Sequence, residues 1–305
     1  MAKTKDDLGL DRGAQKGRQR TINLDGTYNI KRIGEDASPF EIYHWLINTR
    51  WSHYWLSVVL FYGVMNALFA ICYLFIGVEH FSGITDEGLI KNIEQCFFFS
   101  VQTFTTVGYG GIHPTNMSSN LVASFEAFIG LMSFALATGT LYGRFSRPNA
   151  KIKYSENVII TPFEDKRALQ FMVANKRSSN LMEMEATVNL SWVENNVRAF
   201  AQLELQITKV AMMPTSWTVN HIINDESPLK NFDLKAILEK EVEIFVLLKG
   251  FDETFSQTIY SRHSFVAKEF VWGAKFVRPF HVDENGKLIM NIDKVGLIEK
   301  AEIKA

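Results

Sequence analysis

Two long apolar segments constrain the fold of this chain more than any other feature of its 305 residues. Residues 51–76 contain no Asp, Glu, Lys or Arg, and residues 121–142 contain only one, Glu126. Each segment is long enough to cross the roughly 30 Å of hydrocarbon in a lipid bilayer as a helix, and the Trp and Tyr residues at the start of the first suit the headgroup level. We predict an outer membrane helix over residues 51–76 and an inner membrane helix over residues 120–147.

The distribution of basic residues predicts how the two helices are oriented. Residues 77–120, which lie between them, contain a single basic residue, Lys91. By contrast, Lys31, Arg32 and Arg50 precede the first helix, and Arg144, Arg147, Lys151 and Lys153 lie at the end of the second or just after it. Cytoplasmic loops carry an excess of Lys and Arg, so we expect both termini in the cytoplasm, in a multi-pass protein of the cell membrane. The alternative, a soluble protein with two buried core helices, does not account for this asymmetry.

The residues before the first span divide into an arm and a short helix. Residues 1–37 are predicted to be a cytoplasmic arm, of which residues 1–20 have too little apolar surface to fold alone. The sequence Ser38-Pro39-Phe40-Glu41 then combines a helix cap, Pro at the first helical position and an acid three residues past the cap. We predict an amphipathic helix over residues 38–50 that lies in the lipid interface, with an ordinary surface helix packed on protein as the alternative.

The C-terminal half, residues 148–305, has the pattern of apolar and polar residues that is typical of a β domain. Its β-branched and apolar runs are short and separated by polar turns, which predicts a β-sandwich. The runs are 157–161, 169–174, 186–193, 200–207, 215–221, 244–249 and 257–260. The predicted fold class is therefore an α+β membrane protein with a pore domain over residues 51–147 and a cytoplasmic sandwich after it.

The loop between the two membrane helices holds the most specific motif of the chain. An apolar run ending at Phe104 suits a re-entrant half-helix over residues 94–104, and Thr105-Thr106-Val107-Gly108-Tyr109-Gly110 follows it. These residues match the potassium-channel signature, in which backbone carbonyls replace the water around K⁺. Gly108 and Gly110 allow the backbone conformations that a Cβ forbids. We expect K⁺ to bind at Thr106, Val107, Gly108 and Tyr109, and one loop per chain implies a homotetramer.

The chain as a whole, from about Asn29 to Phe280, resembles the inward-rectifier potassium channels, in particular their bacterial branch. The resemblance rests on five motifs in the C-terminal half: residues 155–159 (SENVI), 171–177 (FMVANKR), 216–221 (SWTVNH), 225–229 (DESPL) and 270–276 (FVWGAKF). It implies an immunoglobulin-like cytoplasmic domain that forms a tetrameric vestibule below the pore.

The resemblance also implies roles for single residues. Gly130 matches the glycine at which the inner helix bends, with close helix packing as the alternative, and Tyr142 matches the bulky ring at the cytoplasmic gate, with an interfacial aromatic as the alternative. Phe134 falls where strongly rectifying members have an acid, so we expect weak block by polyamines. Glu183 matches an acid of the cytoplasmic vestibule, although a solvated surface acid is the simpler interpretation.

We expect contacts with anionic lipids, such as phosphoinositides, near the membrane surface. Arg50-Trp51 resembles the first half of the family's lipid-contacting motif, but Ser52 replaces the second basic residue. The residues expected to contact lipid headgroups are Arg50, Trp51, Arg144, Arg147 and Lys151. The chain also has Gln102 and Ile112 where animal members commonly pair an acid with an arginine across the filter.

Other functions find little support in the sequence. There is no phosphate-binding loop and no HExxH motif, and the histidines lack partners at catalytic spacing, so we expect no enzyme and no cofactor, with K⁺ only as the permeant ion. A net charge of -1 gives no global attraction to nucleic acid. A non-conducting membrane sensor is the remaining alternative. Glu126, which is costly inside a span unless it faces protein or water, is expected to make a hydrogen bond behind the filter.

Overall fold

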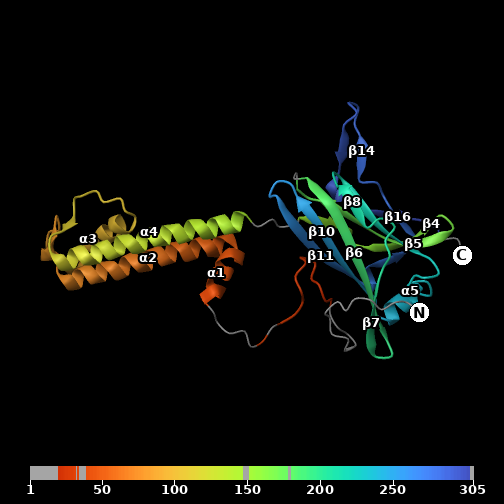
Figure 1. The fold of residues 1–305 in the computed structure, drawn as a ribbon, viewed down its shortest axis with the longest axis horizontal. Coiled ribbons are helices and arrows are strands. Elements are labelled where there is room, and N and C mark those ends of the chain that lie inside the picture. Colours follow the sequence, from red (N-terminus) through yellow and green to blue (C-terminus); the bar gives the residue numbers. More distant parts are fainter. Residues whose placement is uncertain (1–19, 32, 34–38, 147–150, 178–179, 303–305) are drawn as a thin grey trace. The chain divides into compact units, whose positions relative to one another are not determined.

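The computed structural model describes residues 20–31, 33, 39–146, 151–177 and 180–302 (Figure 1). The chain divides into two compact units. One comprises Gly34–Arg147, and the other combines Met1–Ile33 with Pro148–Ala305. The first unit is helical and contains both predicted spans, and the second is built mainly from β-strands.

Four helices make up the first unit. They are α1 (Pro39–Asn48), α2 (Trp51–Ile76), α3 (Leu89–Phe104) and α4 (Met117–Phe145). A short 3-10 turn, η1 (Val78–His80), follows α2, and strand β1 (Phe81–Ser82) pairs with β2 (His113–Pro114). In Figure 1 the long helices α2 and α4 run side by side, and α3 lies at the end where the chain passes between them.

The two long helices expose apolar side chains on most of their surface. Both meet the length and hydropathy that a membrane span requires, and in their most apolar windows only 22% of α2 and 11% of α4 is buried inside the structure. The core helices of a soluble protein would be mostly buried. These helices therefore have the character expected of membrane spans, with their uncovered faces left for lipid or for other copies of the chain.

The helix bounds differ from the predicted ones in instructive ways. The outer helix has the predicted bounds, but α3 begins at Leu89 rather than at residue 94. Its first turn contains the polar Lys91 and Asn92 beside Leu89 and Ile90: the Asn92 amide donates to Asp86 at 2.8 Å, and Lys91 pairs with Glu87. A prediction made from apolar residues alone misses such a turn.

The inner helix also begins earlier than predicted. It starts at Met117 because Asn116 and Ser119 form a reciprocal capping box, and it ends at Phe145 rather than at residue 147. Ser38, the expected cap of the interfacial helix, and Pro148, the expected end of the inner helix, lie outside the described residues.

The second unit contains two five-stranded sheets that face each other as a sandwich. The first sheet has the order β11-β10-β6-β7 with β8 also paired to β6, and the second has the order β12-β4-β5-β3 with β9 also paired to β5. Smaller pairs join β13 to β16 and β14 to β15. The strands of the first sheet are β6 (Leu181–Glu194), β7 (Val197–Gln202), β8 (Lys209–Met212), β10 (Glu243–Asp252) and β11 (Gln257–Val266). Those of the second are β3 (Ile152–Tyr154), β4 (Val158–Phe163), β5 (Lys166–Asn175), β9 (Ser216–Ile223) and β12 (Phe270–Trp272). The remaining elements are β13 (Ala274–Phe276), β14 (Phe280–Val282), β15 (Leu288–Met290), β16 (Ile298–Lys300), helix α5 (Leu234–Glu239) and the 3-10 turns η2 (Ala267–Glu269) and η3 (Ile292–Lys294).

The hydrophobic core of this unit lies between the two sheets. Side chains from β4, β5 and β9 on one sheet pack against side chains from β6, β10 and β11 on the other. The rings of Phe171 and Phe265 meet across it at 5.5 Å. The predicted run over residues 200–207 ends as a strand at Gln202, but Leu203 and Leu205 beyond it remain buried in the core. Their apolar character therefore reflects core packing rather than strand pairing.

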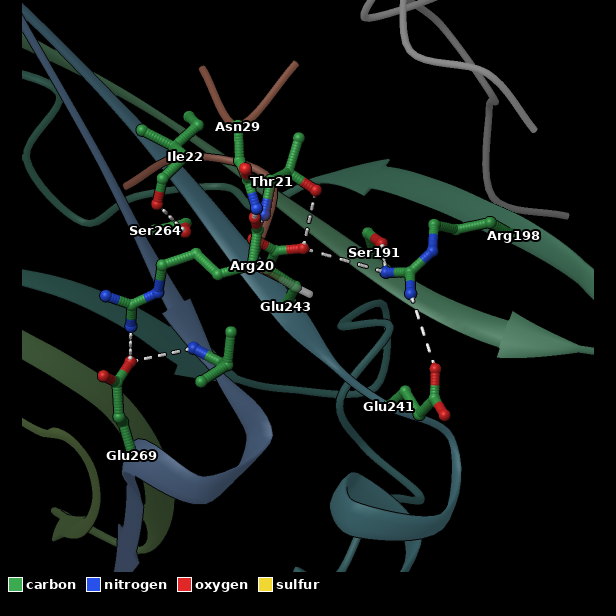
Figure 2. Close-up of polar contacts among 11 residues, drawn as sticks. Arg20, Thr21, Ile22, Asn29, Ser191, Arg198, Glu241, Glu243, Ser264 and Glu269 are labelled. Carbon is green, nitrogen blue, oxygen red and sulfur yellow. Dashed lines mark hydrogen bonds and ion pairs between the residues drawn. The ribbon is translucent and has the colours of Figure 1, made fainter. Parts of the chain in front are cut away.

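Residues 20–31, which precede the first helix, pack on the sandwich. The described residues of the predicted arm, 20–31 and 33, belong to the same compact unit as the strands. Figure 2 shows the contacts: the Thr21 amide and hydroxyl both donate to the Glu243 carboxylate at 3.0 Å, the Ser264 hydroxyl donates to the Ile22 carbonyl, and Arg20 pairs with Glu269. Of the arm predicted over residues 1–37, the described residues thus lie in the compact unit that also contains the sandwich, and the rest of the arm lies outside the described residues.

Candidate functional site

The backbone between α3 and β2 alternates between ordinary and left-handed conformations. Thr106, Gly108 and Gly110 have φ values of 57°, 54° and 82°, whereas Val107 and Tyr109 between them have negative φ. Left-handed φ costs little at Gly but is uncommon for a residue such as Thr. An extended segment that alternates in this way can turn successive carbonyl oxygens toward the same side, which is the arrangement a carbonyl-lined ion path needs.

Space does not explain why glycine occupies residues 108 and 110. Apart from its chain neighbours, a Cβ added at Gly108 or Gly110 would meet no atom of the single chain within 4 Å, so within one chain the left-handed backbone is what favours glycine there. The neighbouring Gly111 has neither a left-handed φ nor a contact that a Cβ would disturb. It is therefore a natural control position beside the motif.

The start of this segment is tied to the last turn of α3. The amides of Val107 and Gly108 both donate to the Gln102 carbonyl, at 3.0 and 3.3 Å, and the Thr105 hydroxyl donates to the Val101 carbonyl at 2.6 Å. The side chains of Val107 and Tyr109 remain 52% and 81% exposed in the single chain. Such exposed apolar surface beside an ordered backbone requires a cover, which other copies of the chain would supply.

Behind α3 lies a fully buried polar cluster that joins three helices. Glu126 on α4 accepts from Tyr73 on α2 through Oε2, and its Oε1 is hydrogen-bonded to the Ser100 hydroxyl on α3. The same hydroxyl lies 3.0 Å from Asn66 Oδ1, and all four side chains are completely inaccessible. The hydrogen bond expected for Glu126 is present. Its partners were not predicted, although Asn66, a polar residue within the first span, carries a recognisable signal.

Gly130 lies against the end of α3. A Cβ at this residue would sit 2.0 Å from the Phe104 carbonyl oxygen and 2.8 Å from its carbon. The helix α4 runs unbroken through Gly130 from Met117 to Phe145. Of the two alternatives that the sequence left open, close packing has direct geometric support here, and the hinge stays a prediction.

Phe134 and Tyr142 both present their rings outward from α4. Each is 74% exposed in the single chain. Phe134 lines an apolar groove of about 880 Å³ together with Thr106, Phe104 and Trp45. Thr106 and Phe134 therefore border the same groove of the single chain, which residues of α1 and α2 also line. The cavity role of Phe134 stays a prediction. The gate role of Tyr142 stays a prediction.

The residues expected to contact lipid differ in their surroundings. Arg144 is half-buried and donates through Nη2 to the Thr49 carbonyl at 2.7 Å and through Nη1 to the Leu46 carbonyl, both at the end of α1. Its guanidinium also lies 4.5 Å from the centre of the Trp51 ring. Arg144 thus links α4 to the end of α1 through these two hydrogen bonds.

The other basic residues in that set are more accessible. Arg50 and Lys151 are exposed, and Arg147 lies outside the described residues. Glu183, the expected vestibule acid, is exposed on β6 and lies 3.5 Å from Lys209 on the neighbouring strand. Part of its charge is therefore balanced locally.

Two of the histidines that lack catalytic partners in the sequence are structural in the β unit. His221 is buried, with Nδ1 2.6 Å from the Glu204 carbonyl and Nε2 2.8 Å from the Ser227 hydroxyl, and burial lowers its pKa. His263 is stacked on Tyr154 at 4.3 Å, and burial lowers its pKa to about 4. His281 is exposed. Among the described residues, no group of three or more His, Cys, Asp or Glu is placed to hold a metal ion.

Comparison with known proteins gives consistent matches over both units. The family model described as "Inward rectifier potassium channel C-terminal domain" matches residues 152–304, and the model described as "Ion channel" matches residues 57–147. Inward rectifier potassium channel Kirbac3.1 of Paramagnetospirillum magnetotacticum is 31% identical over 284 residues, which cover 90% of this chain and 94% of that protein.

Animal proteins match at lower identity. G protein-activated inward rectifier potassium channel 1 of Homo sapiens is 23% identical, with 88% of this chain and 59% of that protein covered. G protein-activated inward rectifier potassium channel 3 of Mus musculus is 24% identical, and the match covers 86% of this chain and 73% of that protein. The chain thus spans nearly the full length of its bacterial relative but a smaller share of the animal ones.

Proposed function

This chain belongs to the inward rectifier potassium channel family, and from that premise we propose that four copies assemble around a pore that passes K⁺ across the cell membrane. The filter in this proposal is Thr106-Val107-Gly108-Tyr109-Gly110. The permeant ion would be held at Thr106, Val107, Gly108 and Tyr109, by the peptide carbonyls together with the Thr106 hydroxyl. The protein is an ion channel by family, and the proposal assigns it no cofactor.

One observation carries the filter assignment. The sign of φ alternates from Thr106 to Gly110, in a loop that follows a half-length helix and lies between two apolar helices of spanning length. Irregular backbone at membrane depth is tolerated only where protein buries it or where it lines a watery path. The exposed Val107 and Tyr109 side chains support a ring of four chains, because neighbouring copies would then cover them.

The packing of the N-terminal segment supports the proposed orientation. Residues 20–31 precede the first span, yet they belong to one compact unit with the sandwich that follows the second span. Two crossings return the chain to its starting side, so both segments must lie on the same side of the membrane. The basic residues flanking the spans favour the cytoplasm for that side.

Gating and lipid control extend the proposal to the inner ends of the helices. The inner helices would meet at Tyr142, and Phe134, an uncharged ring facing the cavity, would leave polyamines little to bind.

The basic residues near the membrane surface would attract anionic lipid headgroups, at roughly 1 kcal/mol per basic residue. These residues are Arg50, Lys151 and Arg147, with Trp51 beside them. Arg144 would act mainly through its carbonyl contacts with α1. Glu183 would add negative charge to the cytoplasmic vestibule.

Ion flux through the purified protein in liposomes tests the proposal. We expect Rb⁺ uptake that exceeds Na⁺ uptake and is blocked by Ba²⁺, with a higher or lower rate when anionic lipid is included. Gly108→Ala should abolish uptake because alanine resists the left-handed φ of residue 108. Gly111→Ala, which changes a glycine with ordinary φ and open space, is the matched control and should conduct.

The outcomes separate the channel from a membrane sensor. A folded tetramer that binds lipid or another ligand but passes no ions under any condition would favour the sensor. Uptake that survives Gly108→Ala would show that the filter assignment is wrong.

A further inference from the structure

The buried cluster behind α3 contains more polar contacts than an ionised glutamate can satisfy. Its hydrogen-bonding atoms come from Asn66 and Tyr73 on α2, Ser100 on α3 and Glu126 on α4, and all four side chains are fully inaccessible. In the apolar interior of a membrane-spanning unit, no water is present to hydrogen-bond a polar atom that lacks a protein partner, so each such atom destabilises the fold. The number of available protons can therefore be compared with the number of contacts.

The orientation of the Asn66 amide fixes the first part of the cluster. Its Nδ2 donates to the Tyr62 carbonyl at 2.7 Å, one turn back in α2. Its Oδ1 therefore faces the Ser100 hydroxyl, 3.0 Å away, and can only accept. Exchanging the two amide atoms would set two acceptors against each other at Tyr62, so the Ser100 hydroxyl must donate its single hydrogen to Asn66.

The contact between Ser100 and Glu126 then needs a second proton. The Ser100 oxygen is hydrogen-bonded to Glu126 Oε1 as well as to Asn66 Oδ1, but one hydroxyl hydrogen cannot serve both. The other carboxylate oxygen, Oε2, already accepts from the Tyr73 hydroxyl. A hydrogen on Oε1 that is donated to Ser100 completes every contact, and an ionised carboxylate leaves one oxygen pair without a hydrogen.

We propose that Glu126 is a neutral carboxylic acid that donates to Ser100 and accepts from Tyr73, and that this cluster positions the pore helix α3 between the two spans. The chain of donors then runs from Glu126 to Ser100, from Ser100 to Asn66 and from Asn66 to the Tyr62 carbonyl. A neutral acid also avoids placing a lone charge among apolar helices.

The position of Ser100 explains why the cluster bears on ion passage. Ser100 lies four residues before Phe104, the last residue of α3, and the filter segment follows directly. The Phe104 carbonyl in turn packs on Gly130, one helical turn beyond Glu126 on α4. The hydrogen-bonded cluster and the Gly130 contact therefore hold α3 at two successive turns. This inference rests on the proposed channel function only for its effect on ion flux.

Infrared spectroscopy of the purified protein at neutral pH tests the protonation state without any ion flux. We expect a carbonyl stretching band of a protonated carboxylic acid in the wild-type protein, and its loss in Glu126→Gln. If the difference between the two proteins shows only carboxylate bands, the proposal is overturned.

Two substitutions test the positioning role. Glutamine can donate to Ser100 through its amide and accept from Tyr73 through its oxygen, so Glu126→Gln should leave the ratio of Rb⁺ to Na⁺ uptake within about twofold of the wild type. Glu126→Leu, which has a similar volume and no hydrogen bonds, should reduce that ratio about tenfold or more because Tyr73 and Ser100 lose their partner. Equal ratios in all three proteins would overturn the positioning role.

A second readout keeps this test independent of the proposed function. The thermal midpoint of the tetramer should stay near wild type in Glu126→Gln and fall in Glu126→Leu. If the wild-type protein passed no ions but kept the infrared band and this order of stabilities, the channel proposal would fail while the assignment of Glu126 as a neutral acid would stand.

Discussion

Gly130 on α4 packs directly against the carbonyl group of Phe104, the last residue of α3. A side chain at residue 130 would place its Cβ 2.0 Å from that oxygen, closer than any real carbon contact. The obstacle is backbone, which cannot rotate away as a flexible side chain can. The inner helix and the pore helix therefore approach each other at a distance that only glycine permits.

Replacing Gly130 with alanine should destabilise the tetramer. The added methyl group overpacks the contact and should cost roughly 1–3 kcal/mol. The thermal midpoint in detergent, followed by size-exclusion chromatography after heating, measures the loss. Gly63→Ala on α2 is the control because a Cβ there meets nothing within 4 Å of the chain. Since alanine also favours helix over glycine, Gly63→Ala should be neutral or slightly stabilising. Equal midpoints for both variants would contradict this account.

Arg144→Gln should loosen α1 from α4. The guanidinium donates to the Leu46 and Thr49 carbonyls at the end of α1, and hydrogen bonds to a charged group contribute about 1.5–3 kcal/mol. We expect amide hydrogens of residues 42–48 to exchange about tenfold faster or more. Mass spectrometry of the tetramer in detergent without anionic lipid measures the exchange.

Arg50→Gln separates this structural role from lipid binding. Arg50 is exposed at the start of α2, so its loss should leave exchange in α1 unchanged when lipid is absent and should weaken only the response to anionic lipid. If Arg144→Gln instead altered the lipid response alone, Arg144 would be a headgroup contact after all.

Thr21→Val should release the N-terminal segment from the sandwich. Two of the contacts that hold the buried Glu243 carboxylate come from Thr21, and the substitution removes the hydroxyl donor while keeping the side-chain shape. A hydrogen bond to a buried carboxylate contributes about 1.5–3 kcal/mol. Trypsin should then cut after Arg20 several-fold faster than in the wild type. Thr258→Val, at an exposed residue of β11, should leave the rate unchanged.

The β unit should lose stability as the pH falls below about 6.5. Burial lowers the pKa of His263 from 6.5 to about 4, so between these values the unfolded chain binds more protons than the folded one. The stabilisation is complete above pH 6.5 and is lost as the pH decreases toward 4, by about 3 kcal/mol for this residue. The lowered pKa of His221 acts in the same direction.

Replacing the titrating ring isolates the contribution of His263. His263→Phe keeps an aromatic ring for the stack on Tyr154 and should flatten the dependence of the thermal midpoint on pH between 4 and 6.5. His281→Gln, at an exposed residue, should leave the profile unchanged. A profile for His263→Phe that matches the wild type would refute the assignment.

The sequence predicted the membrane helices well because their signal is local. Residues 51–76 lack charge entirely, and α2 has those bounds. The first turn of α3, which mixes apolar and polar residues, escaped prediction, since the criterion for a half-helix was a continuous apolar run and the pairing of Asn92 with Asp86 is not visible in composition.

In the sandwich, the seven predicted runs correspond to the longer strands, but shorter ones were missed. The strands β3, β8 and β12 to β16 have three or four residues each. Such segments bury too few side chains to create an alternating pattern, and some of them pair with distant segments, as β12 does with β4. The docking of residues 20–31 was missed for the same reason, because Glu243 is more than two hundred residues from Thr21.

The sequence by itself determined the two spans, the β-rich domain and the filter motif, because length, charge and glycine placement act on neighbouring residues. Only the tertiary structure decided what Glu126, Gly130 and Arg144 contact, since each meets a partner on another helix. Hydrogen bonds and close packing between distant segments depend on positions in space, to within a few tenths of an ångström, which the order of residues along the chain does not record.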